Sequence, residues 1–141
     1  MKLTILSLFI TLLASFSVHA ENMVTAKIPS NMSIENGLIK LFNEEAIKKG
    51  SPLNLFMKEL KANPDNKDYF IDDEITSKDL VTLDSGASAG QFGISYLIFI
   101  RAGYKSNTFA VGYLKAYSYG SIDEEDDVTI SIAEPAKVTI E

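Results

Sequence analysis

The sequence predicts an α+β domain in which two N-terminal helices pack on a four- to five-stranded antiparallel meander sheet. Three observations lead to this class. Apolar residues in the front half recur at helical spacing, those from Leu80 onward alternate with a period of two, and short turns separate the alternating segments. No internal repeat or long linker divides the chain, so residues 21–141 are expected to form a single domain.

The first twenty residues have the three parts of a cleavable export signal. Lys2 supplies the positive charge, an apolar run extends from Leu3 to Phe16, and Val18 and Ala20 occupy the −3 and −1 positions. The alternative is a retained anchor, but the run is shorter than the roughly 20 residues that span a bilayer. We therefore expect cleavage after Ala20 and a periplasmic or secreted mature protein with no membrane span.

Cleavage changes the inventory of side chains. It removes Lys2 and the only histidine, His19, and leaves 12 basic and 19 acidic side chains, a net charge of −7. The mature sequence then contains no histidine, cysteine or tryptophan. A secreted domain without disulfides is more typical of bacteria than of eukaryotes. The negative charge disfavours nucleic acids and anionic membranes as ligands and favours a cationic partner.

The front half is predicted to hold one edge strand and two helices. Residues 22–29 alternate and end at Pro29, and residues 33–49 carry a helical apolar stripe that ends before Gly50. A second helix opens at Ser51 and Pro52, a capping serine followed by proline at the first helical position, and stops at residues 63–64. Residues 65–74 are expected to form a polar loop.

The back half is predicted to form strands at residues 80–83, 92–102, 108–119, 128–132 and 137–140, with a hairpin loop at 103–106. If Ala102 pairs with Asn107, Ile98 lies opposite Val111. The expected core face then carries Phe92, Ile94, Tyr96, Ile98, Ile100, Phe109, Val111, Tyr113 and Tyr117. The other face carries Gly93, Ser95, Ala110, Gly112 and Ala116 with Leu97, Phe99 and Leu114. We expect a packed helix over this second face; the alternative is a groove for a partner.

One segment resembles a catalytic motif. Residues 86–90 fit G-x-S-x-G with Ser88 at the centre, which in a hydrolase sits on a strand-to-helix turn beside a histidine. The mature sequence has no histidine, no Ser-x-x-Lys occurs, and a strand is expected after the motif. We interpret the segment as a turn of small residues between two strands.

No metal or cofactor is expected. Zinc and other transition metals prefer cysteine and histidine ligands. The acidic stretches at 65–74 and 123–127 do not fit the spacing of a calcium loop, although weak calcium binding by their carboxylates remains an alternative. No glycine-rich phosphate loop occurs in the sequence.

These exclusions favour a binding protein over an enzyme. The leading hypothesis is an inhibitor or immunity protein that neutralises a cationic exported enzyme, such as a cell-wall hydrolase. The candidate contact residues are the acidic run with its neighbouring tyrosine and two serines of the small-residue segment: Asp123, Glu124, Glu125, Asp126, Asp127, Tyr119, Ser85 and Ser88. The alternatives are a structural or assembly subunit of the cell envelope that pairs through strand edges, and an enzyme working through carboxylates or tyrosine. A solvated loop with no partner is the alternative for the acidic run.

Overall fold

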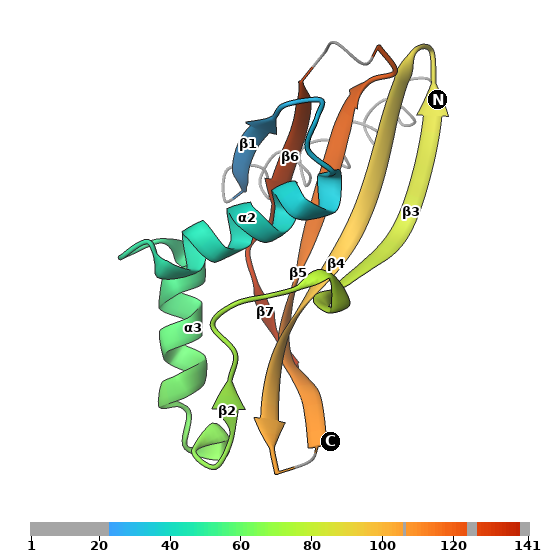
Figure 1. The fold of residues 1–141 in the computed structure, drawn as a ribbon. Helices are drawn as coiled ribbons and strands as arrows, with labels where there is room; N and C mark the ends of the chain where they lie inside the picture. The colour runs from blue at the N-terminus through green and yellow to red at the C-terminus, as the bar shows by residue number, and fades with distance from the viewer. Residues whose placement is uncertain (1–22, 106, 124–126, 139–141) are drawn as a thin grey trace, which may run out of the picture.

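The computed structural model describes residues 23–105, 107–123 and 127–138. The protein is a mixed helix-and-strand fold with two helices and a curled antiparallel sheet, and strands are its larger part (Figure 1). In chain order the elements are β1 (Val24–Ile28), α2 (Ile34–Ile47), α3 (Pro52–Ala62), the 3₁₀ turn η1 (Pro64–Asn66), β2 (Phe70–Ile71), the 3₁₀ turn η2 (Ser77–Asp79), β3 (Leu80–Ser88), β4 (Gln91–Tyr104), β5 (Asn107–Ser121), β6 (Val128–Ile132) and β7 (Ala136–Lys137).

The sheet is built around the long hairpin β4–β5, which runs the length of the molecule (Figure 1). Its main order is β1-β6-β5-β4-β2, with β3 also paired to β4 and β7 also paired to β5. Within the described residues the sheet thus has seven strands, not the four or five expected, and it is not a simple meander because β1 joins at the β6 edge. The strand expected at 137–140 is β7; residues 139 and 140 lie outside the described residues.

The predicted starts of both helices are confirmed. Ser33 caps α2 by accepting the N–H of Asn36 at 3.2 Å, and Ser51 caps α3 by accepting the N–H of Asn54 at 3.1 Å. Pro52 occupies the first turn of α3, where its missing N–H has no cost. The Ser51 hydroxyl also donates to the carbonyl of Glu45 at 2.6 Å, so one side chain joins the end of α2 to the beginning of α3.

Two glycines mark where helices approach strands closely. A Cβ on Gly37 of α2 would lie 2.8 Å from Ile28 Cγ2 of β1 and 3.3 Å from Ile130 Cδ1 of β6. A Cβ on Gly112 of β5 would lie 3.0 Å from the ring of Phe56 of α3. Side chains larger than hydrogen are therefore excluded at both contacts unless the neighbour moves.

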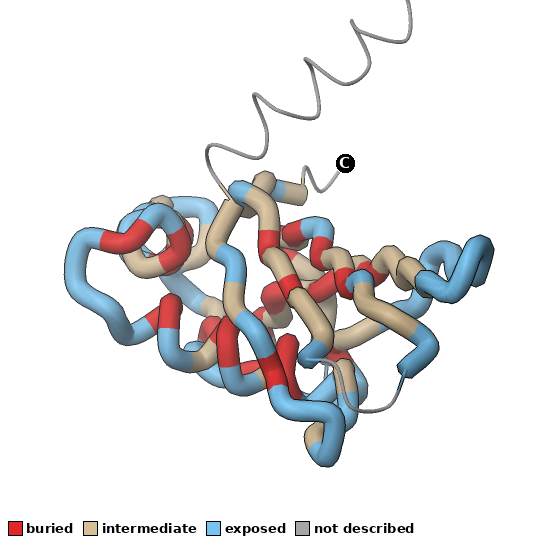
Figure 2. Tube along the Cα trace, turned by 90° about the horizontal axis from the view of Figure 1, so that it is seen from above, coloured by how far each residue is buried: buried red, intermediate tan, exposed pale blue. Residues whose placement is uncertain are grey.

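The core lies at the centre of the molecule, with exposed residues at the periphery (Figure 2). Along β4 the even-numbered residues Tyr96, Ile98, Ile100 and Ala102 are buried almost completely, as the alternation predicts. The predicted pairing is wrong, however. Ile98 lies opposite Leu114, and Val111 is an extra residue in β5 because Ile100 pairs with Gly112 while Arg101 pairs with Ala110.

This β-bulge reverses the alternation of β5. From Gly112 onward the residues that share the buried face with Ile98 are Leu114, Ala116 and Ser118. Tyr113 and Tyr117, which we expected in the core, lie half-buried on the opposite face. The expected small-residue face is therefore divided: Gly112, Leu114 and Ala116 are buried, whereas Gly93, Ser95, Leu97 and Phe99 share the face with Tyr113 and Tyr117.

The hairpins are also tighter than predicted. Tyr104 pairs with Asn107, so the strands β4 and β5 both extend into the predicted loop at 103–106 or up to its border. The strand β3 extends five residues beyond the predicted end at residue 83 and runs into a two-residue turn at Ala89 and Gly90, both with positive φ. The expected polar loop at 65–74 contains η1 and the short strand β2.

Candidate functional site

Tyr119 is the most prominent of the candidate contact residues. It lies near the end of β5, between Gly93 of β4 and Thr129 of β6, and 59 % of its surface is exposed. Gly93 has no side chain and Thr129 a short one, so the neighbouring strands cannot cover the ring. Tyr104, at the opposite hairpin tip, is exposed as well.

The acidic run lies only partly within the described residues. Asp123 and Asp127 are exposed, and Glu124, Glu125 and Asp126 lie outside the described residues. Asp127 and Tyr119 line the same open hollow of about 470 Å³, together with Lys27, Gln91, Gly120, Ser121 and Thr129. The structure therefore brings the tyrosine and one carboxylate of the run together.

Asp123 lines a different hollow. Its backbone N–H is held by the Ser121 hydroxyl at 3.1 Å, and it borders an open depression with Phe92, Ile122 and Val128. The two described carboxylates thus lie on different parts of the same end of the sheet. A partner that binds in the hollow of Tyr119 and Asp127 would therefore not contact Asp123 in that hollow. Asp123 would act on such a partner only as a nearby negative charge.

The two candidate serines are separated by the pleat of β3. Ser88 pairs with Gln91, which lines the hollow of Tyr119, whereas Ser85 pairs with Ile94 on the face of the sheet that carries Tyr96. Ser88 is followed by the turn at Ala89 and Gly90 and then by β4, where a nucleophile elbow would have a helix. Ser88 therefore adjoins the Tyr119 hollow and Ser85 does not.

A second hollow lies on the same face at Gly93 and Ser95, where the sequence favoured a packed helix and left a groove for a partner as the alternative. It has a volume of about 490 Å³ and is lined by Tyr117 and Tyr119 of β5 and by short side chains of the neighbouring strands, Thr25, Gly93, Ser95, Thr129 and Ser131 among them. Thr25 and Ser131 hydroxyls lie 3.0 Å apart at its border. We name this surface, Tyr117 and Tyr119 with those short side chains, the tyrosine face. Only the β-bulge at Val111 places Tyr117 on it, and no local sequence signal marks that bulge.

Two polar clusters lie away from these hollows. In the first, Tyr96 donates from its hydroxyl to Glu35 Oε1 at 3.3 Å, which joins β4 to the first turn of α2. Burial, and then the charge of Glu35, raise the pKa of Tyr96 to about 12, while the Ser118 hydroxyl acts in the opposite sense. This phenol therefore stays protonated at neutral pH and serves as a hydrogen-bond donor in the core.

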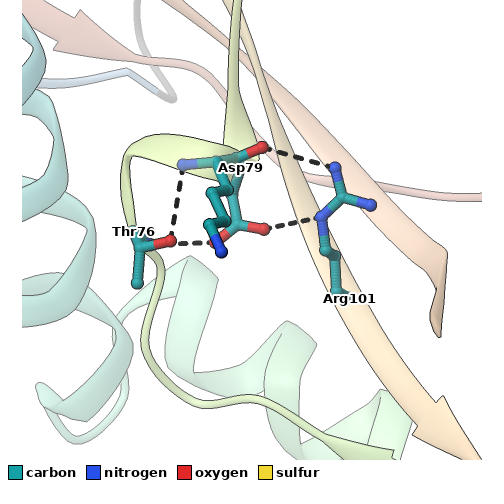
Figure 3. Close-up of polar contacts among 4 residues, drawn as sticks. Thr76, Asp79 and Arg101 are labelled. Carbon is teal, nitrogen blue, oxygen red and sulfur yellow. Dashed lines mark hydrogen bonds and ion pairs between the residues drawn. The ribbon is translucent and has the colours of Figure 1, made fainter. Parts of the chain in front are cut away.

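The second cluster fixes the beginning of β3 (Figure 3). Asp79 accepts the Thr76 N–H on Oδ2 at 2.8 Å and Arg101 Nε on Oδ1 at 2.7 Å, and Arg101 Nη2 also donates to the Lys78 carbonyl at 3.4 Å. The Thr76 hydroxyl completes the capping box of η2. The two hydrogen bonds from Arg101 hold η2 against β4 (Figure 3).

The described residues contain no group of three or more histidine, cysteine, aspartate or glutamate side chains placed to hold a metal ion. None of the helices in that part of the chain is long and apolar enough to cross a bilayer. Comparison with models of protein families, with curated proteins and with solved structures gives no match to this chain.

Proposed function

We propose that this chain is an exported binding protein, periplasmic or secreted, which acts as an inhibitor or immunity protein against a cationic exported enzyme such as a cell-wall hydrolase. The observation that carries the proposal is the largely exposed ring of Tyr119 beside the carboxylate of Asp127 in one hollow. Tyrosine gives a large contact area at a small entropic cost and favours protein interfaces. The adjacent carboxylate suits a lysine or arginine of the partner.

The distribution of small and polar side chains supports the same surface. The tyrosine face combines tyrosine, serine, threonine and glycine, the residue types that dominate adaptable protein-binding surfaces. The proposal takes both helices to pack on the other face of the sheet, through contacts such as Gly37 with Ile130, so that the tyrosine face is left for the partner. The negative charge of the mature chain draws a cationic partner toward it.

The test begins with capture from an exported-protein extract. The mature chain is immobilised and the bound proteins are identified, with Tyr119→Ala as the matched variant. A basic protein retained by the wild type and lost with Tyr119→Ala supports the proposal, because removal of a central aromatic anchor raises the dissociation rate. Failure to retain any basic protein would count against the function itself.

Association and dissociation rates measured with the captured partner distinguish electrostatic steering by the carboxylates from direct contact with Tyr119. The double variant Asp123→Asn/Asp127→Asn is expected to slow association and to weaken its salt dependence, because exposed charges act within a Debye length of about 8 Å at physiological salt. The control is Asp65→Asn/Asp68→Asn, an equal change of charge around η1, at the opposite end of the molecule (Figure 1). Equal effects of both pairs would mean that net charge and not this end of the sheet attracts the partner.

A structural or assembly subunit of the cell envelope is the second candidate, and one observation favours it. The strand β3 lies at the edge of the sheet and is exposed over almost its whole length. Exposed strand edges pair with other chains. Assembly of the purified mature chain into regular oligomers would favour this role over the inhibitor.

A further inference from the structure

The free edge of β3 is the longest exposed strand edge in the described part of the chain. Leu80–Ser88 pairs with β4 on one side, and among the described residues no strand pairs with its other side (Figure 1). The opposite edge of the sheet, β1, has only five residues and carries the charged Lys27. An edge strand presents alternate backbone N–H and C=O groups that an added strand can pair with.

The turn that ends β3 shows which residues present these groups. Ala89 and Gly90 form a two-residue hairpin turn with positive φ at both positions. In such a hairpin the flanking residues, Ser88 and Gln91, hydrogen-bond to each other, and hydrogen-bonded pairs then recur at every second residue. The backbone groups of Ala87 and Ser85 are therefore directed toward the free edge.

Few features protect this edge from pairing. Proteins commonly block edge strands with lysine, proline or a bulge. The strand β3 has no lysine or proline and a single charged residue, Asp84, and its one irregularity lies between Thr82 and Asp84. Val81 and Leu83 are 42 % and 53 % exposed, so apolar side chains are available to an added strand beside the backbone groups.

The position of Asp84 distinguishes between the occupants of the edge. It is the central residue of Leu80–Ser88, so antiparallel pairing of two copies along the full strand would place Asp84 opposite its own counterpart. Like charges directly opposite destabilise a strand pair, whereas opposite charges stabilise it. The charge of β3 thus opposes a second copy and favours a different chain with a lysine or arginine at that position.

We propose that the free edge of β3 binds an extended segment of another protein by antiparallel strand addition. The segment carries a cationic side chain opposite Asp84 and apolar side chains beside Val81 and Leu83. Its backbone pairs with Ser85 and Ala87. The inference does not depend on the surface at Tyr119, and the two sites make separate contacts.

The test uses three synthetic peptides of the same length as β3, added to the mature chain. The first alternates threonine and valine with a central lysine, the second has glutamate in place of the lysine, and the third is the lysine peptide with alternate amides N-methylated. We expect the lysine peptide to bind about two- to fivefold more tightly than the glutamate peptide. We also expect it to slow hydrogen exchange at Ser85 and Ala87, and the N-methylated peptide not to bind.

Four variants locate the binding. Asp84→Lys is expected to reverse the preference between the lysine and glutamate peptides. Ser85→Pro removes an outward N–H and should abolish binding, whereas Ser85→Ala keeps that N–H and should bind as the wild type does. If Ser85→Pro fails to fold, the N-methylated peptide still tests the backbone pairing. Tyr119→Ala should leave peptide binding unchanged, which separates this site from the proposed enzyme-binding surface.

Three results would overturn the inference. The first is absence of binding by the lysine peptide, and the second is equal binding by the N-methylated peptide. The third is a concentration-dependent dimer of the mature chain that protects Ser85 and Ala87 without any peptide, since this would assign the edge to a second copy.

Discussion

The buried phenol of Tyr96 makes the stability of this fold sensitive to alkaline pH. Tyr96 is 1 % exposed, and its hydroxyl donates to Glu35 at 3.3 Å. Burial and the neighbouring carboxylate both disfavour the phenolate, so the pKa rises from 10.0 to about 12. The folded protein therefore keeps this proton over a pH range in which the unfolded chain has released it.

The sign of the effect follows from that difference in proton binding. Tyr96 makes its full contribution to the unfolding free energy below about pH 10. This contribution falls as the pH rises toward about 12, because the phenol ionises more readily in the unfolded chain. The difference between the two pKa values corresponds to about 2–3 kcal/mol of unfolding free energy when the loss is complete. Ionisation of Tyr96 does not change the unfolding free energy below about pH 7.

The substitution Tyr96→Phe isolates this contribution. At neutral pH the variant should be less stable by about 0.5–1.5 kcal/mol, because it lacks the hydrogen bond to Glu35. The variant has no phenol at this position to ionise, so it does not lose this stability at alkaline pH. The wild-type and variant curves of unfolding free energy against pH should therefore cross between about pH 10 and pH 11. Urea unfolding at a series of pH values measures both curves, with the exposed Tyr119→Phe as a control that should follow the wild type. Parallel curves for Tyr96→Phe and the wild type between about pH 9 and pH 11 would refute the reasoning.

Four further outcomes are expected. Ile98→Ala should lower the unfolding free energy by about 2–5 kcal/mol in urea, and near-wild-type stability would contradict the assigned core. Asp79→Asn should cost about 1–3 kcal/mol and speed hydrogen exchange at the start of β3, because Arg101 loses its charged acceptor; unchanged exchange would leave η2 without its proposed tether. Mass spectrometry of the exported protein should show an N-terminus at Glu21, and a mature pool that begins at residue 1 would exclude signal cleavage. Ser88 should not be labelled by a serine-directed phosphonate, and covalent labelling there would restore the hydrolase hypothesis.

The helices could be predicted from the sequence because their signals are local. Ser33 and Ser51 lie within a few residues of the N–H groups that they cap, and Pro52 directly follows Ser51 at the first helical position, so the local sequence contains these signals in full. The burial of Ile98 could also be predicted, since β4 alternates without interruption.

The pairing of β4 with β5 could not be predicted because it depends on residues far apart in the chain. The bulge at Val111 lies beside Gly112, whose missing side chain admits Phe56 from α3, more than fifty positions earlier. The last residues of β3 were missed for a related reason. Gly86 and Ala87 have little intrinsic preference for strands, and they are extended because β4 pairs with them.

The bulge at Val111 sets which side chains of β5 face the core. Deletion of Val111 would remove the extra residue and restore strict alternation, with Gly112 still opposite Ile100 and every later side chain still in phase with β4. Leu114 and Ala116 would stay opposite Ile98 and Tyr96, and the core would lose only the side chain of Val111, which is 3 % exposed. A deletion of one residue later in β5, with the bulge kept, would instead turn every following side chain to the other face of the sheet. The length of β5, as much as its composition, decides which surface this protein presents.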